Sequence, residues 1–206
     1  MSQETGRQLC NPWRCRVDSG EKDVSESSGS RSTLVFGGAR SGKSRFAERL
    51  AINSGLEKVY VATGAAYDDE MADRIAAHRQ QRGDGWITIE EQLDIENLLL
   101  SECRPGRVLL VDCLTLWLSN LTFADRDIPA HAAKLCAAIR QVRGACIFVS
   151  NEVGMGIVPE NSLSRSFRDA QGRLNQDIAD ACNQVVFVAA GLPLLMKPHT
   201  QLEITP

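Results

Sequence analysis

Eight consecutive residues have the types and spacing of a phosphate-binding loop. They are Gly37, Gly38, Ala39, Arg40, Ser41, Gly42, Lys43 and Ser44. Their pattern, G-x-x-x-x-G-K-[ST], directs backbone N–H groups at an anion beside a helix N-terminus, where the helix dipole favours negative charge. Lys43 would reach the terminal phosphates of a nucleotide, and the Ser44 hydroxyl would bind Mg²⁺. The alternative is a chance match in a glycine-rich turn.

The sequence on both sides of this loop favours a nucleotide site over a chance match. Residues Thr33–Phe36 form an apolar run that is typical of a buried strand. An amphipathic segment from Ser44 to about Ser54 predicts a helix, and Gly55 follows it as a stop. A phosphate-binding loop requires this order of strand, loop and helix.

A second strand ends in a carboxylate that could complete the site. Four aliphatic residues precede Asp112 in the segment Arg107–Asp112. In nucleotide-binding proteins with such a loop, an Asp at a strand end helps to hold Mg²⁺. An Asp at this position also commonly starts a turn, but the loop upstream favours the metal role.

Two further segments carry candidate functional groups. The segment from Asp68 to about Gln81 predicts a helix with acidic residues first and basic residues last. Met71, Ile75 and His78 share one of its faces. On spacing alone, such a histidine is more often packed or on the surface than chemically active. The polar, glycine-rich segment Asn151–Asn161 follows a strand, and it is either a binding loop or a plain surface loop.

Hydrophobic patterns place these segments in an alternation of strands and helices. Strands are predicted at Thr33–Phe36, Lys58–Ala62, Trp86–Glu90, Arg107–Asp112, Ala145–Ser150, Gln184–Ala189 and Leu192–Met196. Helices are predicted at residues 44–54, 68–81, 93–100, 114–121, 127–143 and 164–183. This alternation predicts an α/β fold of the P-loop NTPase type, with three layers and a mostly parallel central sheet. Ligands bind such sheets at the carboxyl ends of the strands.

Composition indicates one folded domain and a short extension. The 206 residues, 43% of them hydrophobic, suit a single core within residues 33–206, whereas the polar residues 1–32 predict a disordered N-terminal extension. Trp13 could instead dock part of this extension on the body. Trp117, in an apolar helix, is expected in the core.

Charge and cysteine usage restrict the partners and the location of the protein. A net charge of -3 without a basic cluster argues against nucleic acid as a partner. Seven dispersed cysteines without C-x-x-C spacing predict reduced, packed thiols and a cytoplasmic location. No apolar run is long enough to predict a membrane span.

A set of motifs spread over residues 33–197 resembles one enzyme family. The motifs are Phe36–Arg45, Val61–Thr63, Asp68–Met71, Arg74–Ile75 with His78–Arg79, Asn151–Asn161, Phe167–Asp169 and Gly172–Gln176. Together they resemble the bifunctional adenosylcobinamide kinase / adenosylcobinamide-phosphate guanylyltransferase family of cobalamin biosynthesis, called the CobU/CobP family. Ala77 departs from members that carry a second histidine there, and residues 1–32 are an addition to the shorter members.

The resemblance implies two reactions. ATP or GTP would phosphorylate the aminopropanol hydroxyl of adenosylcobinamide. GMP would then pass from GTP to adenosylcobinamide phosphate through a GMP-histidine intermediate, with release of pyrophosphate. Family members are homotrimers, which implies the same assembly for this chain.

The resemblance also implies roles for single residues. His78 would carry the GMP, and Lys43 would be the second catalytic residue. Nucleotide would be bound by the phosphate-binding loop together with Thr63, Gly64, Ala65, Arg82, Glu90 and Asp112. Ser44 and Asp112 would hold Mg²⁺, while Asn151 and Glu152 would bind the corrinoid substrate.

Two other functions are compatible with a phosphate-binding loop. A nucleotide-dependent switch or ATPase would use the loop to drive a conformational change, and it would not need a covalent nucleotide on His78. A small-molecule kinase without nucleotidyl transfer would release no pyrophosphate from GTP.

Overall fold

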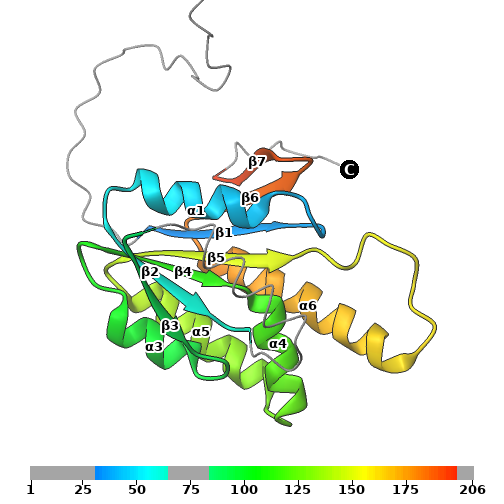
Figure 1. The fold of residues 1–206 in the computed structure, drawn as a ribbon. Helices are drawn as coiled ribbons and strands as arrows, with labels where there is room; N and C mark the ends of the chain where they lie inside the picture. The colour runs from blue at the N-terminus through cyan, green and yellow to red at the C-terminus, as the bar shows by residue number, and fades with distance from the viewer. Residues whose placement is uncertain (1–30, 65–83, 199–206) are drawn as a thin grey trace, which may run out of the picture.

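The computed structural model describes residues 31–64 and 84–198, which form one seven-stranded sheet with helices on both faces (Figure 1). The strands are β1 (Ser32–Gly37), β2 (Glu57–Ala62), β3 (Trp86–Glu90), β4 (Arg107–Asp112), β5 (Ala145–Asn151), β6 (Gln184–Ala189) and β7 (Leu192–Lys197). The helices of the described part are α1 (Lys43–Asn53), α3 (Ile95–Glu102), α4 (Leu114–Phe123), α5 (Ile128–Gln141) and α6 (Ser162–Ala181). The predicted helix at residues 68–81 lies outside the described residues.

The sheet has the strand order β3-β2-β4-β5-β1-β6-β7. All neighbouring pairs are parallel except β6 and β7, which are antiparallel. The middles of the central parallel strands β1, β4 and β5 are apolar and buried because helices cover both faces of the sheet there, whereas β3 at the edge is largely exposed. The predicted α/β fold with a mostly parallel central sheet is therefore confirmed.

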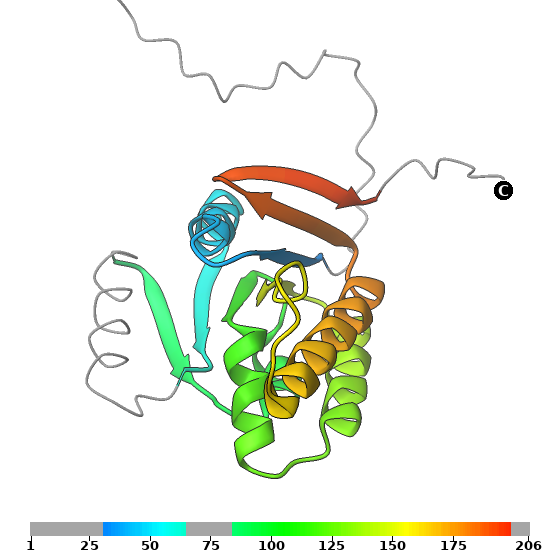
Figure 2. The same cartoon turned by 90° about the vertical axis from the view of Figure 1, so that its right-hand side faces the viewer.

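Two hydrophobic clusters fill the space between the sheet and the helices, one on each face of the sheet. Alternate residues of a strand point to opposite faces, so Leu34 joins one cluster and Val35 joins the other. Ala47 and Ala51 of α1 pack on the Val35 side. The other described helices, α3, α4, α5 and α6, cover the Leu34 side, as both views show (Figures 1 and 2).

Trp117 of α4 anchors the larger cluster. Its side chain is fully buried, and its indole N–H donates to the Leu93 carbonyl oxygen at 2.7 Å. A buried indole N–H usually finds such a partner, because leaving it unpaired away from water is costly. The prediction that Trp117 lies in the core is confirmed.

Two helices, α3 and α6, begin two residues away from the start that the hydrophobic pattern predicts. The segment predicted as helical from residue 93 becomes helical only at Ile95, because the Glu91 carboxylate accepts the N–H groups of Leu93 and Asp94 in a preceding turn. Helix α6 begins at Ser162, two residues before the predicted start, because the Asn161 side chain caps it by accepting the Ser164 N–H at 2.7 Å.

The five cysteines in the described part are free and buried. They are Cys103, Cys113, Cys136, Cys146 and Cys182. This agrees with the prediction of packed thiols for these five. In the described ranges, no helix combines the length and apolar character that crossing a membrane requires.

Candidate active site

The phosphate-binding loop joins β1 to α1, and the backbone requires glycine at two of its positions. A Cβ on Gly37 would lie 2.2 Å from the Val188 carbonyl oxygen. Gly42 has a φ of 92°, which L side chains rarely adopt. The Ser41 carbonyl oxygen accepts the Gly191 N–H at 2.8 Å, which fixes the loop to the turn between β6 and β7.

Several donors of this loop are open to an anion. Helix α1 begins at Lys43, and no side chain caps its first turn. The first N–H groups of a helix have no intrahelical acceptor, so they can bind a phosphate. The Ser41 hydroxyl is also buried without a hydrogen-bond partner in the structure. At the tip of the loop, Ala39 and Arg40 are exposed.

The Lys43 side chain folds back over the loop. Its ammonium group donates to the Gly38 carbonyl oxygen at 3.2 Å. Partial burial lowers the pKa of Lys43, while the nearby Cys113 and Asp112 oppose this shift. A cation that is partly removed from water and lies in the field of Asp112 is well placed to meet the negative charge of a bound nucleotide.

Asp112 and Thr63 lie at the carboxyl ends of adjacent strands. The register pairs Ala62 with Asp112, and the Thr63 N–H donates to the Asp112 carbonyl oxygen at 3.4 Å. The Thr63 hydroxyl donates to the Cys113 carbonyl oxygen at 2.8 Å and accepts the Cys113 N–H at 2.7 Å. Thr63 is fully buried, so these bonds join the ends of β2 and β4, and its neighbour Gly64 is half-buried.

Cys113 follows Asp112 but is not a nucleophile in this structure. Burial, and then the Asp112 charge, raise the pKa of Cys113 to about 11. The thiol is therefore protonated near neutral pH, and the thiolate is the reactive form of cysteine. Asp112 itself is half-buried at the strand end, so its carboxylate remains reachable by solvent.

Asn151 and Glu152 lie beside the loop at the end of β5. The register pairs Gly37 with Asn151, and the Glu152 N–H donates to the Gly37 carbonyl oxygen at 3.0 Å. Both side chains are partly exposed. The Glu152 carboxylate also accepts the Gly154 N–H, which shapes the start of the following loop.

A buried polar network holds this end of β5, and the sequence pattern did not predict it. The Ser150 hydroxyl donates to the Asn175 amide oxygen at 2.6 Å and accepts the Gln171 amide N–H at 3.0 Å. The Asn175 amide N–H donates to the Asn151 carbonyl oxygen at 3.0 Å. Asn175 lies within one of the quoted motifs, but only the folded chain brings it against β5. The network holds the backbone of Asn151 in place from three buried side chains.

The remaining predicted site residues fall into two sets. Glu90 ends β3, its register partner is Ala62, and its side chain is exposed at the same edge of the sheet as Asp112. Ala65, His78 and Arg82 lie outside the described residues, so their predicted roles rest on the sequence alone.

Comparison of the sequence with known protein families identifies the family of this chain. Residues 33–196 match the family described as cobinamide kinase / cobinamide phosphate guanyltransferase. The chain belongs to this family. It is therefore a member of a family of bifunctional enzymes, as the resemblance predicted.

Relatives in the cobinamide kinase / guanyltransferase family are similar over nearly their whole length. The bifunctional adenosylcobalamin biosynthesis protein CobP of Pseudomonas aeruginosa is 49% identical over 166 residues, which are 80% of this chain and 96% of the relative. The bifunctional adenosylcobalamin biosynthesis protein CobU of Escherichia coli is 42% identical over an alignment 179 residues long that covers 80% of this chain and 98% of the relative. Among solved structures, Pyrococcus horikoshii protein PH0250 shares the fold at 11% identity and a TM-score of 0.50, covering 81% of this chain and 86% of that chain.

The described residues of this family member fit a nucleotide with Mg²⁺. The unpartnered Ser41 hydroxyl and the uncapped N-terminus of α1 are donors that suit phosphate oxygens. The Ser44 hydroxyl and the Asp112 carboxylate are hard oxygen ligands, which Mg²⁺ prefers. Both residues are only half-buried, so water can complete the coordination.

The close contact at Gly37 gives a prediction about stability. We expect Gly37→Ala to lower the free energy of unfolding by about 1–3 kcal/mol, because the added methyl group overlaps a backbone oxygen that cannot move alone. Gly38→Ala is the matched control, since a Cβ on Gly38 meets no atom within 4 Å. Urea unfolding of both variants measures the difference. Equal stability of the two variants would contradict the close approach of Gly37 in β1 to the Val188 carbonyl oxygen in β6.

Proposed function

We propose that this chain phosphorylates adenosylcobinamide with ATP or GTP and then transfers GMP from GTP to the resulting phosphate. The observation that carries the proposal is the placement of Lys43 on the phosphate-binding loop within the field of Asp112. Family membership supports both activities, because the family is described by a kinase and a guanyltransferase.

The kinase step needs no covalent enzyme intermediate. The substrate hydroxyl oxygen attacks the γ-phosphorus, the bond to the bridging oxygen breaks, and a nucleoside diphosphate leaves as the hydroxyl proton is lost to solvent. The uncapped N–H groups of α1 and the Lys43 ammonium stabilise the charge on the phosphates during this transfer. Mg²⁺, held by Ser44 and Asp112, would supply further charge neutralisation and orient the phosphates.

The guanylyl transfer runs through two displacements at His78. A neutral imidazole nitrogen attacks the α-phosphorus of GTP, and pyrophosphate leaves with the electron pair of the broken bond. A phosphate oxygen of adenosylcobinamide phosphate then attacks the same phosphorus and frees the histidine. The product is adenosylcobinamide-GDP. Thr63, Gly64, Ala65, Arg82 and Glu90 are the proposed nucleotide contacts, and Asn151 and Glu152 are the proposed corrinoid contacts.

We also propose that the enzyme is a homotrimer in the cytoplasm. The edge strand β7 supports an assembly, because Leu192, Leu194, Leu195 and Met196 are each 45–62% exposed on it. A monomeric protein rarely leaves such a continuous apolar edge uncovered. Sedimentation equilibrium of the full chain measures the subunit number directly.

The experiment that tests the proposed function is intact-protein mass spectrometry after incubation with GTP and Mg²⁺. We expect one GMP per chain, with pyrophosphate released in equal amount. The bond should be labile to acid and stable to base, as a phosphoramidate is. GTP hydrolysis without any adduct would instead favour a nucleotide-dependent switch. Phosphorylation of adenosylcobinamide without an adduct or pyrophosphate would favour a kinase alone.

A further inference from the structure

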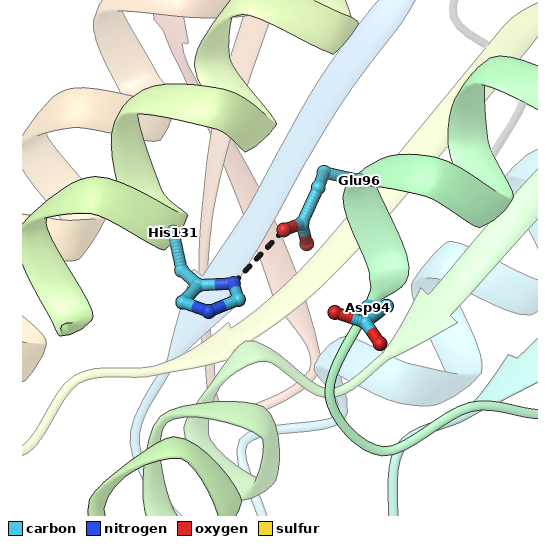
Figure 3. A group of neighbouring side chains, drawn as sticks. All are labelled: Asp94, Glu96 and His131. Carbon is cyan, nitrogen blue, oxygen red and sulfur yellow. Dashed lines mark hydrogen bonds and ion pairs between the residues drawn. The ribbon is translucent and has the colours of Figure 1, made fainter. Parts of the chain in front are cut away.

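Three side chains that the proposed reactions do not use meet where α3 packs against α5. Asp94 precedes the first residue of α3, Glu96 is in its first turn, and His131 is in the first turn of α5. One ligand atom from each residue lies within 4.8 Å of the other two. Figure 3 shows the three side chains pointing toward a common space from these two helices.

Glu96 is buried in this cluster with one of its two carboxylate oxygens unpartnered. Only 3% of the residue is exposed, and one carboxylate oxygen, Oε1, lies 2.9 Å from His131 Nδ1. The other oxygen, Oε2, is buried without a hydrogen-bond partner in the structure. Figure 3 shows it directed into the space between His131 and Asp94. A buried carboxylate oxygen without a partner is costly, so it indicates a missing cation or donor.

The histidine reaches only one side of this carboxylate. His131 is in the first turn of α5, and its Nδ1 contacts one of the two Glu96 oxygens and leaves the other without a partner. The N-terminus of α3 favours negative charge on Asp94 and Glu96. No Lys or Arg forms a salt bridge with Glu96 within the described ranges. Two carboxylates and a neutral imidazole are the forms in which these groups bind metals.

We propose that Asp94, Glu96 and His131 bind one divalent transition-metal cation of the Zn²⁺ class. Imidazole and carboxylate ligands lie about 2.0–2.2 Å from Zn²⁺, which places neighbouring donors about 3.0–3.6 Å apart. The 2.9 Å between His131 Nδ1 and Glu96 Oε1 is already close to this spacing. Asp94 can close the remaining gap, because it is exposed and its side chain makes no capping hydrogen bond.

The cation replaces the proton that now lies between the histidine and the glutamate. The proton between Nδ1 and Glu96 would be lost to solvent, and His131 Nδ1 would coordinate the metal in the tautomer that carries its single proton on Nε2. The Glu96 carboxylate would bind through Oε1 and also bring the unpartnered Oε2 against the cation. The imidazole nitrogen separates this site from the proposed Mg²⁺ site at Ser44 and Asp112, since Mg²⁺ prefers oxygen ligands alone.

A metal here would fix the segment between β3 and α3. Asp94 ends this segment, and two other residues of it are already anchored to α4. The Leu93 carbonyl oxygen accepts from the Trp117 indole, and the Gln92 carbonyl oxygen accepts from the Asn120 amide at 3.1 Å. The same Asn120 amide group donates to the Thr63 carbonyl oxygen at 2.8 Å. The proposed cation would therefore stabilise the segment between β3 and α3, which is linked through Asn120 to Thr63 at the end of β2.

The test is calorimetric titration of Zn²⁺ into the full chain after chelator treatment, in buffer with Mg²⁺ and a reductant that does not bind metals. We expect one equivalent bound and a higher midpoint of thermal unfolding, because the cation binds only the folded arrangement. Asp94→Asn should weaken this binding by about 10-fold or more. Glu96→Gln should do the same while keeping the shape of the buried side chain.

Asp125→Asn is the matched control, since Asp125 is an exposed aspartate outside the cluster. It should bind Zn²⁺ as the wild type does. Circular dichroism establishes whether each variant is folded. If Glu96→Gln does not fold, Asp94→Asn still tests the proposal, because Asp94 is exposed and its replacement should not disturb the core. Zn²⁺ uptake that is equal in wild type and Asp94→Asn would overturn the proposal and assign the metal to other groups, such as the thiols.

Discussion

Replacement of Lys43 by alanine is expected to slow both the kinase and the guanylyltransferase reaction by roughly 10²-fold or more. The ammonium group lies on the phosphate-binding loop and donates to the Gly38 carbonyl oxygen. Without it, the charge that develops on the transferred phosphates loses the cation that lies folded back over the loop, and Arg40, the other cationic side chain of the loop, is exposed at its tip. Steady-state assays of nucleoside diphosphate and pyrophosphate release measure the two reactions separately.

The fold should tolerate this change. The substitution removes one hydrogen bond, from Lys43 to the Gly38 carbonyl oxygen. Such a bond contributes about 0.5–1.5 kcal/mol, so the free energy of unfolding should fall only slightly. Lys134→Ala is the matched control, because Lys134 is exposed on α5 on the opposite face of the sheet from α1. It should leave both reactions unchanged. Turnover in Lys43→Ala equal to that of Lys134→Ala in both assays would contradict the assignment of this loop.

The strands and the loop were predictable from the sequence because their signals are local. Buried parallel strands are short aliphatic runs, and the seven predicted strands match β1 to β7 within about one residue at most ends. The phosphate-binding loop was predictable because its backbone requires glycine at two positions. Gly37 has no room for a Cβ, and Gly42 has a positive φ. The exposure of β7 was not, since Leu194 and Leu195 have the composition of a buried strand.

Contacts between distant residues could not be predicted in this way. Glu96 and His131 are 35 positions apart, and the hydrophobic periodicity of two helices does not state which of their polar residues meet. The same is true of Ser150 with Gln171 and Asn175, which become neighbours only when α6 packs beside β5. Polar pairs of this kind depend on helix packing angles, whereas sequence patterns specify only which face is buried.

The use of a site residue also depends on tertiary contacts. Thr63 stays a predicted nucleotide contact, and the structure shows its hydroxyl bonded to the Cys113 backbone and its carbonyl oxygen to the Asn120 amide. Its position at the strand end was predictable. These bonds, which tie the ends of β2 and β4 together, were not.

His78→Ala is expected to abolish the GMP adduct and the guanylyltransferase reaction while much of the kinase activity remains. The imidazole is the proposed nucleophile toward the α-phosphorus, whereas the kinase step is a direct attack of the substrate hydroxyl on the γ-phosphorus. Loss of the nucleophile therefore removes one reaction and not the other. Intact-protein mass spectrometry with GTP measures the adduct, and phosphorylation of adenosylcobinamide measures the kinase step.

The other two histidines provide the control and limit the alternatives. His199→Ala should form the adduct as the wild type does, because His199 lies outside the family motifs. His131 is a poor substitute nucleophile, since it is 8% exposed and its Nδ1 is engaged with Glu96. An adduct that persists in His78→Ala would thus argue against a histidine intermediate altogether. Loss of both reactions in a folded His78→Ala protein would mean that this residue also shapes the site for the kinase substrate.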